Sequence, residues 1–169
     1  MRTRQQKRGT PEPQAPWNEI LPGLWMGGHS WRDSQGEVHQ AVVDREFALV
    51  ISLFTRPGHG PAPGVEHRVA EIPDDPLTSA QLAVVHQLAQ YTAQAIGEGQ
   101  RTLVRCCAGF NRSGLLVGQA LIEQGYAPAT AIDLIRQRRS PWALNNGIFE
   151  EYLTTGLDLA ILLADLDIG

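Results

Sequence analysis

Two side chains with complementary chemistry, Cys106 and Arg112, lie in one short segment with five residues between them. A cysteine thiolate is a strong nucleophile. An arginine guanidinium is a planar, permanent cation that can donate two parallel hydrogen bonds to the oxygens of one phosphoryl group. Ser113 follows the arginine and adds a hydroxyl. This combination indicates a loop that binds a phosphate-like anion and presents a nucleophile to it.

The only two cysteines of the chain, Cys106 and Cys107, are adjacent, so they cannot cross-link distant segments as a disulfide framework does. A buried cysteine often serves only as a small apolar side chain, but the arginine nearby favours a chemical role for Cys106. Cys107 has two interpretations. It could capture an oxidised Cys106 as a resolving thiol, or it could fill the loop, which the strain of a disulfide between neighbours favours.

The elements on either side of this segment would position it. Residues 102–104 form a short apolar run typical of a strand, and residues 115–124 have a helical pattern. A loop between them would place its amides at a helix N-terminus, where free N–H groups and a partial positive charge attract anions and favour a thiolate. The amides expected to form this anion-binding nest are those of Cys107, Ala108, Gly109, Phe110, Asn111 and Arg112.

The remaining pattern alternates strands with helices. Residues 47–53 form an almost uninterrupted apolar run, as expected for a strand covered by helices on both faces, and residues 65–72 suit a further strand. Helical spacing appears in residues 79–96, where Ser79 is the expected N-cap, and in residues 127–138 and 149–163. We therefore expect an α/β fold with a central, mainly parallel sheet of about four or five strands flanked by helices.

The domain organisation is simple. Residues 1–16 are basic, polar and rich in proline, which predicts a flexible N-terminal tail, and residues 17–169 then form one domain. The tail has no apolar stretch behind its basic residues and does not resemble a secretory signal, so we expect a cytoplasmic protein.

The overall composition excludes several classes of protein. The 169 residues carry a net charge of -4, which disfavours a nucleic-acid partner or an anionic membrane surface. No apolar run reaches the length of about 20 residues needed to span a bilayer. The five histidines are scattered along the sequence and the cysteines lack a ligand spacing, so we expect no metal site.

Residues 104–114 resemble the signature loop of cysteine-dependent protein tyrosine phosphatases, in particular the compact dual-specificity branch. The segment Trp-Asn-Glu-Ile-Leu-Pro-Gly-Leu-Trp-Met-Gly at residues 17–27 resembles the opening strands of that branch. Asn146-Gly147-Ile148-Phe149 resembles its Asn-x-x-Phe element. The resemblance covers most of residues 17–153 and implies a dual-specificity phosphatase-like fold.

The resemblance also implies roles for individual residues. Cys106 would form a phosphocysteine intermediate, Arg112 would hold the phosphoryl oxygens, and Ser113 would hydrogen-bond the sulfur and help it leave. No metal or other cofactor would be needed, and a phosphate or sulfate ion could occupy the loop. The general acid would come from the turn Pro73-Asp74-Asp75-Pro76, with Asp74 as the first choice and Asp75 as the alternative.

One position departs from the family pattern. The residue before the nucleophile is usually histidine and here is Arg105, which keeps a positive charge but differs in shape and does not titrate near neutral pH. We expect Arg105 to tune the loop without inactivating it.

Other residues have two interpretations each. Arg56 and His59 lie in a loop expected at the same sheet edge, where they could contact substrate or be ordinary surface residues. Asn146 could brace the site or cap a helix. The basic group Arg136, Arg138 and Arg139 is expected at a solvated helix end.

The expected substrate is a phosphorylated protein carrying phosphotyrosine, with phosphoserine and phosphothreonine as further possibilities. Other phosphate esters remain open, because an RNA 5′-triphosphatase or a phosphoinositide phosphatase would use the same Cys106 and Arg112 chemistry on this scaffold. The acidic composition mildly disfavours both. A catalytically weak phosphate-binding module is a further alternative, although it would usually lack the cysteine, the arginine or the acid.

Overall fold

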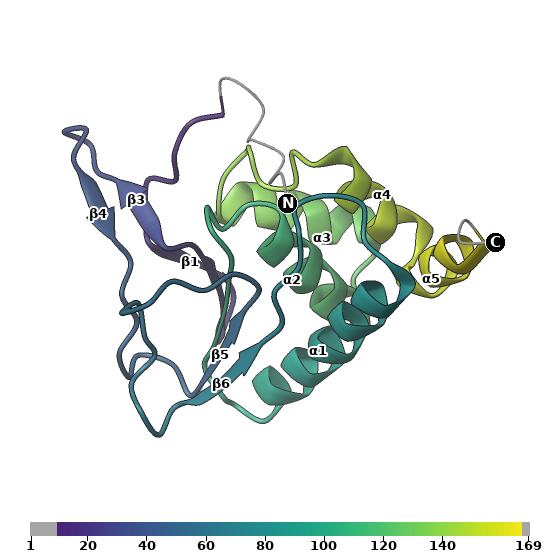
Figure 1. The fold of residues 1–169 in the computed structure, drawn as a ribbon, viewed down its shortest axis with the longest axis horizontal. Coiled ribbons are helices and arrows are strands. Elements are labelled where there is room, and N and C mark those ends of the chain that lie inside the picture. The colour runs from purple at the N-terminus through teal and green to yellow at the C-terminus, as the bar shows by residue number, and fades with distance from the viewer. Residues whose placement is uncertain (1–9, 167–169) are drawn as a thin grey trace.

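The computed structural model describes residues 10–166 and contains a five-stranded sheet with helices packed against it (Figure 1). The strand order is β1-β2-β7-β5-β6. Its strands are β1 (Trp17–Leu21), β2 (Leu24–Gly27), β5 (Leu49–Ser52), β6 (Glu66–Val69) and β7 (Thr102–Arg105). Only β1 pairs in the antiparallel sense, with β2, and the other pairs are parallel. The expected α/β fold with a mainly parallel central sheet is confirmed.

The register of the parallel strands brings their carboxyl ends to one edge of the sheet. Gly27 of β2 and Ser52 of β5 both lie opposite Arg105 of β7. The segments that follow these three strands therefore leave the sheet side by side, which is where ligands bind in open α/β folds. A separate two-stranded hairpin, β3 (Ser30–Arg32) and β4 (Val38–Gln40), extends from the segment after β2.

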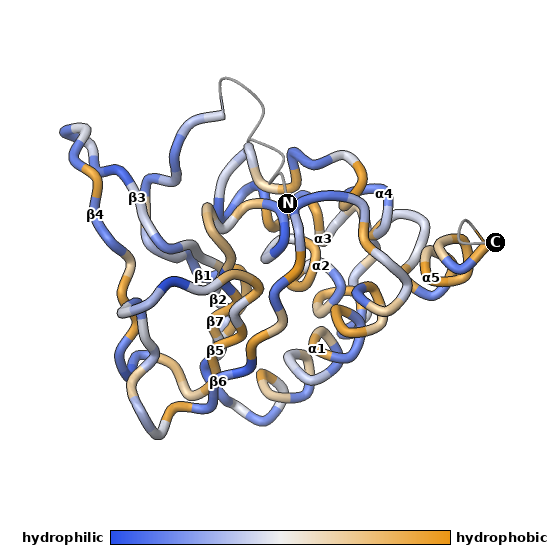
Figure 2. Tube along the Cα trace, viewed as in Figure 1, coloured by the Kyte–Doolittle hydropathy of each residue, from blue (hydrophilic) through white to orange (hydrophobic). Residues whose placement is uncertain are grey.

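The central strands β5 and β7 are buried along their whole length, which explains their continuous apolar sequences. Helices cover one face of the sheet (Figure 1). The other face packs against a small cluster that joins Val50 and Leu103 to Val43 and Phe47, with Trp17 and Trp25 beside it. The expectation of helices on both faces of β5 was wrong, because an apolar strand does not specify what covers it. Figure 2 shows hydrophobic segments in the middle of the sheet, around β5 and β7.

The helices are α1 (Ser79–Gly97), α2 (Arg112–Glu123), α3 (Pro128–Arg138), α4 (Gly147–Thr155) and α5 (Leu157–Leu166). The cap of α1 is Thr78 and not Ser79: its hydroxyl accepts from the Gln81 N–H, and the Gln81 side chain accepts from the Thr78 N–H. The single helix expected over residues 149–163 is two helices, divided at Gly156, whose φ of 101° breaks the helical path. None of the helices in residues 10–166 is long and apolar enough to cross a membrane.

The chain packs against the domain earlier than the expected boundary at Trp17. Pro13 is buried, and its carbonyl accepts a hydrogen bond from the Arg32 N–H at 2.8 Å. The Pro16 carbonyl accepts from the Gly28 N–H at 3.1 Å. Residues 13–16 are therefore held against the domain by main-chain hydrogen bonds, and the part of the expected tail next to Trp17 is not free. Residues 1–9 of the expected tail lie outside the described residues.

Candidate active site

The segment between β7 and α2 forms a tight loop around Cys106. The Cys106 side chain is buried, and its Sγ lies 3.3 Å from the Ser113 Oγ. The Arg112 side chain is also buried, donates to the Ile72 carbonyl at 3.2 Å and packs against the ring of Phe54. Its Nε has no hydrogen-bond partner within residues 10–166. One buried loop thus contains the Cys106 sulfur, the Ser113 hydroxyl and the unpaired Nε donor of Arg112.

Four successive carbonyl groups of this loop, those of residues 107–110, accept hydrogen bonds from other segments of the chain. The Cys107 carbonyl accepts from the His29 N–H at 2.9 Å, and the Phe110 carbonyl accepts from the Leu144 N–H at 2.9 Å. Between them, the Ala108 and Gly109 carbonyls accept from the Arg139 guanidinium at 3.0 and 3.2 Å. In a trans peptide unit the following N–H points opposite to the carbonyl. The amides of residues 108–111 therefore point away from these partners.

The amides themselves are free. Within the described part of the chain, no N–H from Cys107 to Asn111 donates a hydrogen bond to another protein group. Successive unpaired amides that point the same way form an anion-binding nest, and the N-terminus of α2 adds its partial positive charge. These amides are five of the six that the sequence analysis expected to form the nest, and their binding of an anion stays a prediction.

Arg139 is the brace of the loop, and the expectation that it lies at a solvated helix end was wrong. The side chain is buried and also donates to the Ala15 carbonyl and to the Asn18 Oδ1, both at 2.8 Å. Burial lowers the pKa of Arg139 to about 10, and the negative charge of Cys106 opposes this lowering. Sequence patterns did not reveal this role because its partners are mostly main-chain carbonyls.

Gly109 is required where the loop passes β2. Its φ is +77°, and a Cβ there would lie 2.4 Å from the Gly27 carbonyl carbon. We expect Gly109→Ala to lower the free energy of unfolding by more than about 2 kcal/mol, since it adds a backbone clash to the left-handed strain. Gly36→Ala is the matched control, because Gly36 has a φ of +85° and no atom within 4 Å. Denaturant unfolding of both variants checks this, and equal losses would contradict the packing argument.

The acidic turn places Asp74 against the loop. The Asn111 Nδ2 donates to the Asp74 Oδ2 at 3.0 Å, and the Asn146 Nδ2 donates to the Asp74 Oδ1 at 2.7 Å. Asn146 also caps α4, because its Oδ1 accepts from the Ile148 N–H at 3.1 Å. The Asp75 side chain makes no hydrogen bond within residues 10–166. Of the two acids, Asp74 is the one hydrogen-bonded to Asn111, the residue before Arg112, and to the α4 cap Asn146.

Arg56 lies at the rim of the site, beside Cys107. Its guanidinium is exposed and its Nη2 lies 3.9 Å from the Cys107 Sγ. Burial, reinforced by the charge of Cys106, raises the pKa of the Cys107 thiol. The structure therefore brings Arg56 to the loop, whereas His59 lies behind the loop.

Comparison with known proteins identifies the fold. No family model and no curated protein matches the sequence. Among solved structures, human DUSP28 has a TM-score of 0.66 at 23% identity, over 87% of this chain and 95% of that chain. The Orf virus tyrosine phosphatase OH1 has a TM-score of 0.59 at 18% identity, over 86% of this chain and 90% of that chain. The human tyrosine phosphatase-like serine/threonine/tyrosine-interacting protein has a TM-score of 0.58 at 22% identity, over 88% and 98%.

This chain has the fold of the compact dual-specificity phosphatases.

Arg105 stands at the position where the family resemblance implied a histidine. Its side chain is fully buried and donates to the carbonyls of Gly28, Ala41 and His59 at 3.0, 2.6 and 3.2 Å. Burial lowers the pKa of Arg105 to about 10, and the charge of Cys106 opposes this lowering. Arg105 thus ties three segments together behind the loop. Within residues 10–166, none of the buried guanidiniums of Arg105, Arg112 and Arg139 pairs with a carboxylate.

His29 also supports the segments behind the loop, and the sequence analysis did not predict this role. Its Nδ1 lies 3.1 Å from an Arg105 Nη2 and 3.1 Å from the His59 Nδ1, and its Nε2 lies 2.9 Å from the Phe54 carbonyl. Burial, with the charge of Arg105, lowers the pKa of His29 to about 4. Neutral His29 therefore accepts from Arg105 and donates to Phe54. The sequence feature that could have indicated this role is the position of His29 just after β2, at the carboxyl edge of the sheet.

The lowered pKa of His29 predicts a loss of stability in acid. Between pH 6.5 and about 4 the unfolded chain binds a proton at His29 that the folded chain does not, so the free energy of unfolding falls as pH falls through this window. Above the window both states are neutral at His29. The pKa values of His59 and His67 are also lowered and act in the same direction.

His29→Gln isolates the contribution of one side chain, because glutamine can still donate to Phe54 and does not titrate. We expect the difference in stability between pH 7 and pH 4 to shrink by up to about 3 kcal/mol in this variant. Denaturant unfolding at several pH values measures it. An unchanged slope between pH 6.5 and 4 would show that His29 is not buried in its neutral form.

Proposed function

We propose that this chain is a cysteine-dependent phosphatase that hydrolyses phosphate monoesters, with phosphotyrosine in proteins as the main substrate. The observation that carries the proposal is the set of free amides from Cys107 to Asn111, arranged around Cys106 with Arg112 beside them. Such a cradle suits the equatorial oxygens of a transferring phosphoryl group. The unpaired positive charge of the buried arginines calls for an anion of this kind.

In the first step, the Cys106 thiolate attacks phosphorus and the bond from phosphorus to the ester oxygen breaks. Asp74, held by Asn111 and Asn146, gives its proton to the departing oxygen. The amides of the loop and the Arg112 guanidinium stabilise the charge on the three remaining phosphoryl oxygens. The product of this step is a phosphocysteine.

In the second step, the Asp74 carboxylate takes a proton from water as the water oxygen attacks phosphorus. The bond from phosphorus to sulfur breaks and inorganic phosphate is released. The Ser113 hydroxyl, 3.3 Å from the Cys106 Sγ, donates a hydrogen bond to the departing sulfur. The thiolate and the protonated acid are then ready for another cycle.

Protein phosphotyrosine is favoured over RNA or lipid substrates by the net charge of -4, because extended anionic partners need a broad basic surface. A binding module without turnover is the second candidate, since one neighbour of this fold is named only as phosphatase-like. The presence of Cys106, Arg112 and Asp74 in one site favours turnover.

Substrate profiling tests the proposal. We expect phosphate release from a phosphotyrosine peptide to exceed release from phosphoserine and phosphothreonine peptides, triphosphorylated RNA and a phosphoinositide at equal concentration. Faster turnover of the RNA or the lipid would assign a different substrate class to the same loop. Binding of inorganic phosphate or sulfate with no turnover of any ester would support the binding module instead.

A further inference from the structure

The C-terminal helix α5 presents an uncovered apolar stripe. Its members are Leu159, Leu162, Leu163 and Leu166, with exposed fractions of 47, 61, 48 and 74%. Their spacing of three, four and seven residues puts them on one side of the helix. They are four of the nine large exposed apolar side chains in residues 10–166. Figure 2 shows this helix as a hydrophobic element at the edge of the molecule. Such a concentration is typical of a binding surface.

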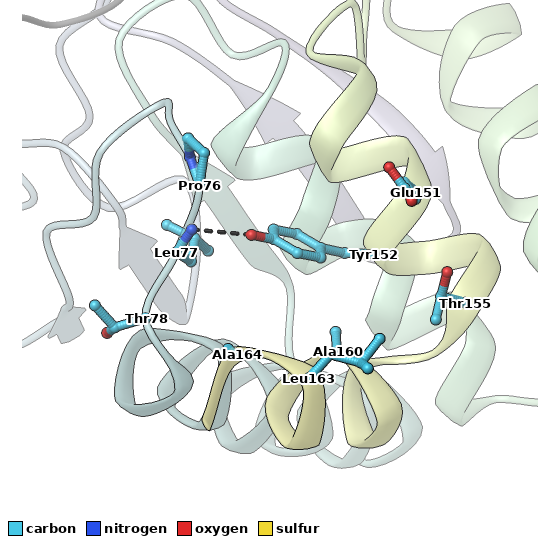
Figure 3. Close-up of a pocket in the computed structure, with 9 residues that line it drawn as sticks. All are labelled: Pro76, Leu77, Thr78, Glu151, Tyr152, Thr155, Ala160, Leu163 and Ala164. Atoms are coloured by element: carbon cyan, nitrogen blue, oxygen red, sulfur yellow. Dashed lines mark hydrogen bonds between the residues drawn. The ribbon is translucent and has the colours of Figure 1, made fainter. Parts of the chain in front are cut away.

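A groove continues the stripe toward the acidic turn (Figure 3). It is lined by Pro76, Leu77 and Thr78 of the turn, Glu151, Tyr152 and Thr155 of α4, and Ala160, Leu163 and Ala164 of α5, and its volume is about 390 Å³. Tyr152 reaches across it, and its hydroxyl accepts from the Leu77 N–H at 2.9 Å. Because Leu163 belongs to both the stripe and the groove, the two form one surface.

The charge of this surface has one sign. Residues 147–166, which make up α4 and α5, contain four acidic side chains and no lysine, arginine or histidine. Glu150 pairs with Arg136, and Asp158 lies 3.4 Å from His86. Glu151 and Asp165 are exposed and form no ion pair within the described chain. An apolar floor with an acidic border complements apolar side chains flanked by basic ones.

We propose that the stripe and the groove form a docking site for an amphipathic helical segment of a partner protein, with leucine-like anchors and flanking lysines or arginines. An apolar helix face laid into such a groove is a common mode of peptide recognition. A second copy of this chain fits poorly, because two acidic borders would then face each other. An anionic membrane is disfavoured by the same charge.

This site is separate from the proposed phosphatase activity, and its occupancy can be measured without turnover. The groove nevertheless begins at Pro76, two residues after Asp74. A partner anchored there is held beside the site that would act on it.

The test uses a synthetic helical peptide of leucine and lysine with leucines at helical spacing. Two control peptides have glutamate in place of lysine, or the same composition in an order that disperses the leucines. Binding to the full chain is measured by fluorescence anisotropy. The variants are Leu163→Gln, which removes an apolar anchor, and Glu151→Gln with Asp165→Asn, which removes border charge. Val38→Thr is the control, since Val38 is 50% exposed on the β3–β4 hairpin.

We expect saturable one-to-one binding of the leucine–lysine peptide only. Affinity should fall at least tenfold in Leu163→Gln, fall several-fold in the charge variant and stay unchanged in Val38→Thr. Equal binding of the glutamate peptide or of the dispersed peptide would overturn the proposal, as would unchanged affinity in Leu163→Gln. A concentration-dependent dimer in sedimentation that Leu163→Gln abolishes would assign the surface to a second copy and would also overturn it.

Discussion

Replacing Cys106 with serine is expected to abolish phosphate release, with a loss on the order of 10⁴-fold or more, as for other enzymes that lose their nucleophile. A serine hydroxyl is a far weaker nucleophile than a thiolate. The amides from Cys107 to Asn111 and the Arg112 side chain remain in place. Binding of inorganic phosphate, measured by calorimetry, should therefore change by no more than a few-fold.

Cys107→Ser is the matched control, because it makes the same change one residue away. Its side chain lies toward Arg56, and we expect turnover to stay within about tenfold of the unmodified protein. Turnover in Cys106→Ser within tenfold of the unmodified protein would contradict the proposed mechanism. A loss in Cys107→Ser as large as that in Cys106→Ser would contradict the assignment of Cys106, and not Cys107, as the nucleophile.

Replacing Asp74 with alanine has the second largest expected effect. A general acid matters most when the departing oxygen is basic, so turnover of phosphotyrosine should fall by about 10²- to 10⁴-fold. Turnover of p-nitrophenyl phosphate should fall less, because nitrophenolate leaves without a proton. Alanine is preferred to asparagine here, since an asparagine amide would place a donor against the Asn111 or Asn146 donors.

Asp75→Ala controls for the acidity of the turn. It should leave both rates nearly unchanged, because Asp75 makes no side-chain hydrogen bond to the loop within residues 10–166. Steady-state rates on the two esters measure both variants. A loss in Asp74→Ala that is equal on the two esters, or a dependence on the leaving group in Asp75→Ala, would move the acid role to another group.

The sequence was most informative where a function depends on neighbours in the chain. The apolar run before Cys106, the spacing to Arg112 and the helix behind it were sufficient to predict a strand, a loop and a helix, and the structure contains β7, the loop and α2 in that order. The choice of Asp74 over Asp75 as the general acid came from a resemblance and stays a prediction; the structure shows hydrogen bonds from Asn111 and Asn146 to Asp74.

The sequence was least informative about long-range contacts to the main chain. Arg139 appeared to be one of several basic residues at a helix end, yet it is buried and holds the Ala108 and Gly109 carbonyls. His29 appeared isolated, and its partners are Arg105 at the end of β7 and Phe54 in the segment after β5. Carbonyl acceptors are present at every residue, so no pattern of residue types marks the ones that a distant side chain will use.

The most direct test of the central claim is the detection of phosphate bound to Cys106. The protein is mixed with p-nitrophenyl phosphate, quenched within milliseconds, digested and analysed by mass spectrometry. We expect a phosphoryl group on the sulfur of the peptide that contains Cys106, formed as fast as nitrophenolate is released and absent in Cys106→Ser. Turnover that proceeds with no phosphocysteine, or with the phosphoryl group on another residue, would contradict this mechanism.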